Sequence, residues 1–323
     1  MAKFIGKKIS VGFGKEIVRG TAVVPAIWYP KTSCSFDEKM EVIENESSIG
    51  VIVDAQDAEV VKRYAEGSIE GFLCVNALAL PFLSLFGAVA STTATTGAYK
   101  HAFTLANTNQ SQSLTIGIDD MIQDYQFANA VIDKMKIKIE AGKYVEVSMD
   151  WMGKKGATGT LSPSYSTDYT LLAKHTVVKL ASNLAGLAAA SPLAIKSLEL
   201  TISKKVEAQD SLGSIDPTDF LNTIVSIEGN MEALYEDEAT YKAIALAGTA
   251  KALRIDVVDT NTVIGLSTNP ELKIDLAKVK FKEWSKNTGA NEVVTQSLGF
   301  KGLYSIADAQ AIIAELYNTT ATL

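Results

Sequence analysis

The side chains best suited to catalysis or metal binding are few and widely separated in this sequence. Its two histidines, His101 and His175, and its two cysteines, Cys34 and Cys74, form no His-x-x-x-His or Cys-x-x-Cys spacing of the kind that surrounds a metal ion. We expect His101 to be packed or hydrogen-bonded at the start of a strand and His175 to be exposed. Each cysteine is expected to be an inert packed thiol. The sequence therefore predicts no metal site and no cofactor.

Other signatures of catalysis are incomplete. Gly12-Phe13-Gly14 is followed neither by a strand–turn–helix pattern nor by Gly-Lys-Ser/Thr, so it indicates neither a dinucleotide site nor a P-loop. The sequence has no Gly-x-Ser-x-Gly nucleophile elbow. Asp119 and Asp120 are adjacent at a strand end, where successive side chains point to opposite faces, so they are poorly placed to share a proton. An enzyme is not predicted.

Length and composition predict a well-packed protein of two domains. The chain has 323 residues, of which 47% are hydrophobic and 21% charged, and this exceeds what one core usually covers. The net charge of −7 argues against tight nucleic-acid binding but is compatible with nucleic acid passing by. Residues 1–8 lack the apolar region of a signal peptide, and the apolar stretch 77–90 is too short to span a bilayer. We therefore expect a soluble protein assembled in a cytosol, without a membrane partner.

The strongest pattern is an internal repeat. Ser-Ile-Glu-Gly occurs at residues 68–71 and again at 226–229, and each copy precedes a helix-like segment, an apolar strand and a long alternating hairpin. The first hairpin closes with Ser-Met-Asp-Trp-Met-Gly at 148–153 and the second with Ser-Leu-Gly-Phe-Lys-Gly at 297–302. Two copies of a β-rich unit without catalytic residues suggest a protein that forms an assembly. The copies are expected to superpose with residues 68–71 on 226–229 and Trp151 on Phe300.

Alternation of apolar and polar residues predicts antiparallel ribbons with one buried and one wet face. It is clearest from 134 to 151, on either side of the turn at 141–143, and a second ribbon is expected from 272 to 300. Helices are predicted near 78–86, ending at Gly87, at 237–247, ending at Gly248, and at 306–317. Strands are also expected at 50–53, 58–61 and 68–75.

These patterns predict a mainly β protein with two tandem units, each with a flanking helix. The expected division is an extended N-terminal arm at 1–48, a first β unit at 49–157, a linker or crossover at 158–192, a second β unit at 193–305 and a C-terminal helix and tail at 306–323. The arm carries aromatic side chains but no periodic pattern that would bury them locally. It is therefore expected to dock on its own domain or on a neighbour.

The order of several motifs resembles a known family. Residues 12–16 (Gly-Phe-Gly-Lys-Glu), 20–25 (Gly-Thr-Ala-Val-Val-Pro) and 28–33 (Trp-Tyr-Pro-Lys-Thr-Ser) resemble the opening of tail tube, or major tail, proteins of long-tailed bacteriophages. The resemblance continues through 66–71, the Leu-rich helix that ends at Gly87, and 101–105 (His-Ala-Phe-Thr-Leu). It covers most of residues 10–153, and the second half resembles the family mainly through the repeat.

The resemblance implies a structural virion protein of β-sandwich or barrel units, each flanked by a helix. Subunits of such proteins close into rings around an inner β-barrel, and the rings stack into a hollow tube. The tube surrounds the tape-measure protein, contacts terminator and distal tail proteins, and later conducts DNA without sequence-specific binding. Location in the virion tail and assembly in the host cytoplasm follow. Two units per chain imply rings of three chains with pseudo-six-fold symmetry, and six chains are the alternative if only one unit has the tube fold.

Two other functional classes remain open on the sequence alone. One is another ring-forming β protein, such as a sheath, a tail terminator or a secreted tube component. The other is a carbohydrate-binding β-sandwich, although only Trp28 with Tyr29 approaches a cluster of exposed aromatics.

The tube hypothesis gives roles to six side chains. Trp28, Tyr29 and Phe36 in the arm, together with the loop at 91–97, are expected to contact an adjacent ring. Glu140, Glu146 and Asp150 on the polar phase of the first ribbon are expected to face the lumen. Lysines at 134, 136 and 138 argue against a uniformly acidic bore, and cross-strand acids are expected to neutralise them in part.

Overall fold

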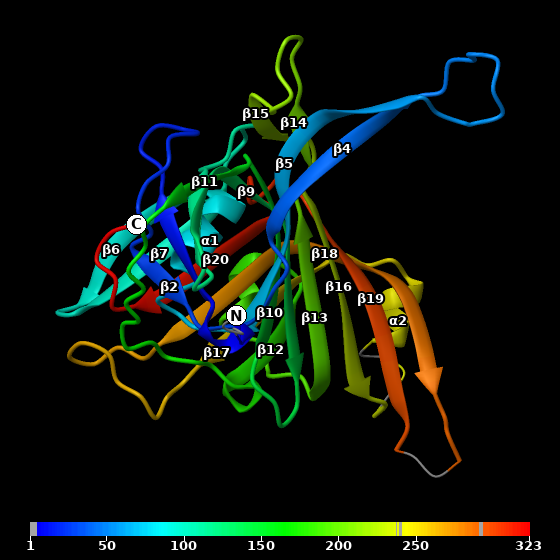
Figure 1. The fold of residues 1–323 in the computed structure, drawn as a ribbon. Coiled ribbons are helices and arrows are strands. Elements are labelled where there is room, and N and C mark those ends of the chain that lie inside the picture. Colours follow the sequence, from blue (N-terminus) through cyan, green and yellow to red (C-terminus); the bar gives the residue numbers. More distant parts are fainter. Residues whose placement is uncertain (1–4, 237, 239–240, 291–292) are drawn as a thin grey trace.

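The chain folds into a mainly β architecture in a computed structural model, as predicted (Figure 1). The structure describes residues 5–236, 238, 241–290 and 293–323. One hydrophobic core runs through both halves of the chain, and most strands join a single antiparallel network. Strand pairing between distant segments therefore determines the fold.

The first half of the described chain begins with a short 3-10 helix, η1 (Gly6–Lys8). It continues with β1 (Ser10–Lys15), β2 (Ile27–Tyr29), β3 (Lys31–Cys34), β4 (Asp37–Asn45), β5 (Asp57–Phe72), α1 (Ala79–Phe86), β6 (Gly87–Thr95), β7 (Ala98–Leu105), β8 (Leu114–Asp119), β9 (Asp124–Glu140), β10 (Glu146–Gly153) and β11 (Gly156–Gly159).

The second half repeats part of this order around a shorter helix, without a counterpart, in the part of the chain that the structure describes, of the β6–β7 hairpin between its helix and its next strand. Its elements are η2 (Ala173–His175), β12 (Thr176–Ala181), η3 (Leu184–Leu187), β13 (Ile195–Ser203), β14 (Val206–Gln209), β15 (Asp219–Asn222), β16 (Ser226–Leu234), α2 (Lys242–Leu246), β17 (Lys251–Val258), β18 (Glu271–Asn287), β19 (Thr295–Leu303) and β20 (Ile312–Asn318).

Seven strands form the central sheet in the order β5, β10, β9, β13, β16, β19, β18. Each neighbouring pair is antiparallel, so the ribbon predicted at 134–151 is confirmed as β9 and β10. Burial alternates along these strands, as in β10, where every second residue from Val147 to Gly153 is buried. Because side chains of a strand point alternately to opposite faces, the sheet has one apolar face against the core and one polar face.

The two halves share irregularities in their strand pairing. Trp151 lies opposite Ile132, and the β9–β10 register shifts between Asp150 and Trp151. In the second half, Phe300 lies opposite Phe281 and the register shifts at the same place. A β-bulge is a local feature of one register. Its recurrence shows that Trp151 and Phe300 occupy equivalent positions, as expected.

The repeated Ser-Ile-Glu-Gly motif does not align in the same way. Trp151 pairs with Gly67 across β5, whereas Phe300 pairs with Gly229 across β16. Gly229 is therefore equivalent to Gly67 and not to Gly71, the last residue of the first copy. The expectation that residues 68–71 superpose on 226–229 is wrong. The strand register is set by the aromatic side chain and the residues opposite it, and not by the repeated four-residue motif.

Two further irregularities confirm the corrected alignment. They occur where β3 pairs with β5 and β13 with β16, and where β8 pairs with β9 and β17 with β18. The shifts fall between Lys31 and Ser33, Ile195 and Ser197, Leu114 and Ile116, and Lys251 and Leu253. We infer that β1–β11 and β12–β20 are two copies of one unit, joined by the pairing of β9 with β13.

The N-terminal segment is built into the first unit. β1 pairs with β2 and β8, and Phe13 of β1 stacks on Trp151 with ring centroids 5.5 Å apart. Tyr29 is fully buried and its hydroxyl donates a hydrogen bond to the carbonyl oxygen of Phe72 at 2.9 Å. The arm was expected to dock on its own domain or on a neighbour. Phe13 and Tyr29 pack in the core of its own domain.

The predicted C-terminal helix is wrong. Ile312–Asn318 is strand β20, which pairs with β18 on one side and with β7 on the other. Ile312, Ala314 and Leu316 are buried while the residues between them are partly exposed. Two available strand edges and this period of two outweigh the weak helical spacing of Ala, Ile and Leu in the segment.

Both flanking helices are present in shorter form than expected. α1 is buried along its whole length and ends at Gly87, whose φ of 84° is the left-handed conformation that suits glycine. α2 covers Lys242–Leu246, and residues 237, 239 and 240 of the predicted helix lie outside the described residues. Each helix packs on the long strand of its unit, α1 on β9 and α2 on β18.

Candidate assembly surfaces

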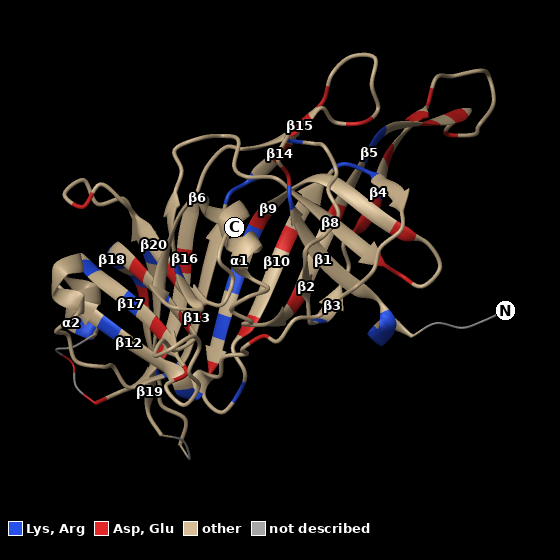
Figure 2. Cartoon of the chain, turned by 90° about the vertical axis from the view of Figure 1, so that its left-hand side faces the viewer, with Lys and Arg blue, Asp and Glu red and all other residues tan. Residues whose placement is uncertain are grey.

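The polar face of the central sheet carries the three residues expected to face a lumen. Asp150 lies opposite Lys134, Glu146 lies opposite Lys138, and Glu140 ends β9 on the same face. Glu146 is exposed, and Glu140 and Asp150 are partly exposed. Figure 2 shows acidic and basic segments side by side on the strands around β10 and β13. The structure thus brings the three acids onto one surface.

Ion pairs join several lysines of this face, and one in the turn after β9, to acids of the same or neighbouring strands. The ion pairs are Lys134–Asp150 at 2.5 Å, Lys136–Glu199 at 2.8 Å, Lys138–Glu140 at 2.6 Å, Lys282–Glu228 at 3.1 Å, Lys301–Glu228 at 3.5 Å, Lys196–Glu232 at 3.5 Å and Lys143–Glu140. Neutralisation by cross-strand acids is confirmed for Lys134 and Lys136, whereas Lys138 pairs with Glu140 of its own strand. The result is a mixed-charge surface on which cations alternate with anions.

The ion pairs keep the acids of this surface ionised. Hydrogen bonds from Lys138 and Lys143 lower the pKa of Glu140 to about 2. A hydrogen bond from Lys282 likewise lowers the pKa of Glu228. Because these groups are exposed, the pairs contribute little to stability, but they leave few free cations to hold a phosphate backbone.

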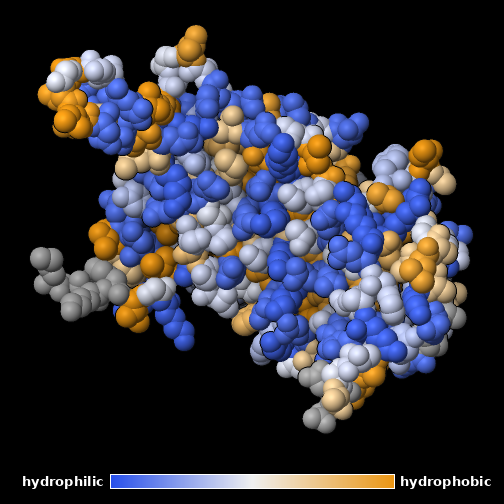
Figure 3. Space-filling view, turned by 90° about the vertical axis from the view of Figure 1, so that its right-hand side faces the viewer, coloured by the Kyte–Doolittle hydropathy of each residue, from blue (hydrophilic) through white to orange (hydrophobic). Residues whose placement is uncertain are grey.

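A projecting hairpin is the surface that the sequence patterns missed. β4 and β5 extend away from the body as a two-stranded ribbon, and residues 46–56 form its tip (Figure 1). The strand predicted at 50–53 is wrong, because residues 50–52 form bends in this tip. Exposed hydrophobic side chains gather on the hairpin, as Figure 3 shows: Met40, Val42, Ile43, Ile49, Val51, Ile52, Val53, Val60 and Val61. Such a patch on a thin ribbon is typical of a protein–protein contact.

The base of the hairpin is held by the second unit. Arg63 in β5 donates its backbone N–H to the carbonyl of Ile215 at 2.8 Å and its guanidinium to Asp216 at 3.2 Å and 3.4 Å. Lys62 forms an ion pair with Asp210 at 2.9 Å. The loop between β14 and β15 therefore braces the hairpin, and both project from the same end of the molecule (Figure 1).

The aromatic residues expected to contact an adjacent ring are inside the chain. Trp28, Tyr29 and Phe36 are all buried, and Phe36 packs edge-on against Phe127 with centroids 5.1 Å apart. They leave almost no surface for another ring. The expectation is corrected because β2, which carries Trp28 and Tyr29, pairs with β1, and β3 pairs with β5, which places Phe36 after β3 in the core of the first unit. Residues 91–95, expected to be a loop, belong to strand β6.

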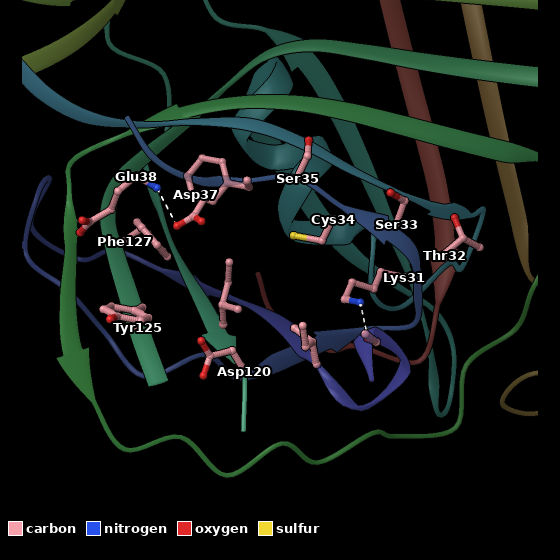
Figure 4. Close-up of a pocket in the computed structure, with 14 residues that line it drawn as sticks. Lys31, Thr32, Ser33, Cys34, Ser35, Asp37, Glu38, Asp120, Tyr125 and Phe127 are labelled. Carbon is pink, nitrogen blue, oxygen red and sulfur yellow. Dashed lines mark hydrogen bonds between the residues drawn. The ribbon is translucent and has the colours of Figure 1, made fainter. Parts of the chain in front are cut away.

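A cavity of about 580 Å³ lies beside β3 and the start of β4 (Figure 4). Residues 31–38 form one wall, and Ile9, Ile118, Tyr125 and Phe127 line the other side. Burial raises the pKa of the Cys34 thiol in this wall, so it is a poor nucleophile. Asp120 is also at the rim, where its carboxylate accepts backbone N–H groups of the following turn.

The remaining reactive side chains have structural roles. His101 is fully buried between Ser91, 2.8 Å from Nδ1, and Asn318 and Thr320, 3.1 Å and 2.9 Å from Nε2, as expected. His175 was expected to be exposed but its side chain is largely buried, with Nε2 3.4 Å from Asp259. Burial raises the pKa of Cys74 to about 11.

Among residues 5–236, 238, 241–290 and 293–323, no group of three or more His, Cys, Asp or Glu side chains could hold a metal ion. Within the same ranges, no helix is long and apolar enough to cross a membrane.

Comparison with known proteins identifies the family of this fold. A family model described as phage tail tube protein matches residues 6–302, which include the first unit, the projecting hairpin and the second unit up to the end of β19. A search of curated proteins gave no match.

Proposed function

Because this chain belongs to the phage tail tube protein family, we propose that it is the subunit of a hollow tail tube built from stacked rings. The observation that carries the proposal is the two-faced central sheet, which includes strands of both halves and whose polar face is at least partly exposed along β10. A sheet of this kind loses its exposed edges when it closes into a ring.

In the proposed ring, three chains supply six equivalent units. The matching bulges of the two halves support this number, since each chain contributes two copies of one unit to the ring. The pairing of β9 with β13 places the copies side by side in one sheet, as neighbouring units of a ring require.

The polar face lines the bore in this proposal. Glu140, Glu146 and Asp150 face the lumen together with the lysines that pair with them. DNA crosses such a surface readily because acids repel phosphates and compete for the cations. The tape-measure protein occupies the bore during assembly in the host cytoplasm, and terminator and distal tail proteins cap the tube.

Stacking of rings is assigned to the β4–β5 hairpin. Its tip exposes Ile49, Val51, Ile52 and Val53 beyond the body of the molecule, where an adjacent ring would lie. A two-stranded ribbon is marginally stable alone, so docking on a neighbour also orders it. The hairpin takes the role first given to Trp28, Tyr29 and Phe36.

Electron microscopy of the purified protein tests the proposal. We expect tubes from the unaltered chain and rings without long tubes from the double variant Ile52→Glu, Val53→Glu. Burying these two side chains between rings contributes roughly 3–6 kcal/mol to each contact between subunits of adjacent rings. Loss of the two side chains should therefore raise the critical concentration for tube formation at least about tenfold. Ile306→Glu, at an exposed site in the β19–β20 connection, is the matched control and should form normal tubes.

Two results would contradict parts of this proposal. Particles that remain single closed rings under all conditions would favour a terminator or a secreted ring protein. Tubes of normal length from the double variant would show that the hairpin tip does not stack the rings.

A further inference from the structure

The junction between the two units is an ordinary antiparallel strand pair. Ser203 of β13 lies opposite Lys134 of β9, and Thr201 lies opposite Lys136. The junction is reinforced by the ion pair of Lys136 with Glu199 on the polar face. Here β9, the long strand of the first unit, meets β13 of the second unit.

The equivalent strands at the two ends of the chain lack this partner. β18 is equivalent to β9, and among the residues that the structure describes its residues 283–287 pair with β19 on one side only. β3 and the first half of β4 are equivalent to β13, and in the described part of the chain they pair only with β5. The chain thus contains one complete junction, between β9 and β13. The strands equivalent to these two, β18 and the β3–β4 segment, have open edges at the two ends of the central sheet.

We propose that β18 of one chain pairs antiparallel with the β3–β4 segment of a second copy, in the register that joins β9 to β13. The inference rests on the proposed tube and names the edges that close its ring. It predicts Glu283 opposite Lys39 of the neighbouring chain, Ser285 opposite Asp37 and Asn287 opposite Ser35.

The register follows from the shared ladders. Glu283 lies opposite Gly299, as Lys134 lies opposite Asp150, so Glu283 takes the place of Lys134. Lys39 lies opposite Tyr64 in β5. The corresponding pair in the second unit is Ser203 with Ser226, so Lys39 takes the place of Ser203.

Charge at the two edges is complementary in this register. Glu283 and Lys39 are both exposed, and neither has an ion pair within the described ranges of the chain. Opposite charges on directly opposed residues stabilise a strand pair, and like charges destabilise it. The same contact placed one residue along would put the two side chains on opposite faces of the sheet.

The cavity beside β3 supports the same pairing. In the second unit, the matching space between β12 and β13 is only about 80 Å³, and Ile139 of β9 is among the residues that line it. Thr176 and Leu198 there correspond to Ile9 and Cys34 around the cavity of about 580 Å³. The first unit therefore has room where the second unit holds the end of a strand from its neighbour. Figure 4 shows this room in the first unit, beside residues 31–38.

Trp284 provides a spectroscopic reporter of this edge. It takes the position of Met135, which is fully buried beside Ile202 of the adjoining unit. Trp284 is only partly buried, whereas Trp28 and Trp151 are already buried in the chain. Pairing of the edge should cover Trp284 and shift its emission to shorter wavelength on assembly.

Cysteine cross-linking tests the register. In a Cys34→Ser background, the double variant Lys39→Cys, Glu283→Cys is assembled and treated with an oxidant or a short bis-thiol reagent. Directly opposed residues of antiparallel strands have Cβ atoms about 4.5–5.5 Å apart, close enough for a covalent link. We expect covalent dimers and trimers on denaturing gels, with the trimer as the largest species.

The matched controls are each single variant and the pair Glu38→Cys, Glu283→Cys, which places the thiols on opposite faces. These should stay monomeric on the gel. Tubes that form normally without the Lys39–Glu283 link, or with no change in Trp284 emission, would overturn the edge pairing and leave the tube proposal intact. A chain that remains monomeric under all assembly conditions would overturn both.

Discussion

Replacement of Trp151 tests the central claim about packing. Its side chain is fully buried, stacks on Phe13 at 5.5 Å between centroids, and lies between Gly67 of β5 and Ile132 of β9. Truncating a buried aromatic to alanine typically costs about 3–5 kcal/mol, because the lost contacts leave a cavity. We expect Trp151→Ala to fall in that range.

The indole also permits a sharper comparison. Nε1 of Trp151 is buried and has no hydrogen-bond acceptor among the described residues. Leaving a buried donor unpaired costs about 1–3 kcal/mol, and phenylalanine carries no such donor. Trp151→Phe keeps an aromatic ring against Phe13, so its loss of packing should be largely offset, with a net cost below about 1.5 kcal/mol.

Urea unfolding of the unassembled chain measures both effects. Phe300→Ala at the equivalent position should resemble Trp151→Ala, and Trp284→Ala, at a partly exposed site, should cost about 1 kcal/mol. The reasoning is refuted if Trp151→Ala unfolds at the same urea concentration as the unaltered chain. It is also refuted if Trp151→Phe is as unstable as Trp151→Ala, because the aromatic stack would then have no role.

Two further predictions concern pH. Burial and then the nearby charge of Asp256 raise the pKa of Glu271 to about 7. Between about pH 4.5 and 7 the folded protein therefore keeps a proton on Glu271 that the unfolded chain releases. The free energy of unfolding should fall as pH rises through this range. Glu271→Gln should flatten that decline in thermal unfolding, and an unchanged slope would contradict the assignment. Burial and then Arg19 lower the pKa of Lys204 to about 7, so this lysine should destabilise the fold most at low pH and progressively less as pH rises towards 10.5. Lys204→Met loses the hydrogen bond from Nζ to the Ser84 carbonyl at 2.9 Å. The substitution should still raise the melting temperature more at pH 6 than at pH 9. The opposite order would contradict this explanation.

Local patterns predicted the elements that depend on short-range chemistry. The ribbon of β9 and β10 follows from strict alternation, and the end of α1 follows from Gly87, whose positive φ terminates the helix. The polar position of Glu140, Glu146 and Asp150 follows from the same alternation. In each case the signal lies within a few residues of the feature that it predicts.

Local sequence patterns could not predict the features that depend on strands far away in the sequence. β20 became a strand because β7 and β18 offer edges on both sides, and neither edge is visible in residues 306–323. Trp28 and Tyr29 became core residues because β1 and β2 add to the first unit. One signal for the projecting hairpin was present, since Met40 and Val42 alternate with charged residues, but nothing in it reveals that no core lies beneath.

The duplication changes what assembly of a ring requires. In the proposed three-chain ring, every second unit junction is the covalently linked β9–β13 pair, and only the junctions between β18 and β3–β4 must form by association. Each association step costs translational and rotational freedom, so halving their number favours closure at low concentration. Duplication within one chain also lets the two units differ. The long β4–β5 hairpin alternates around the proposed ring with the short β14–β15 hairpin, which braces it through Asp210 and Asp216. A ring of identical single units would have to carry six long hairpins or none, whereas this chain places a supporting loop beside every projecting one.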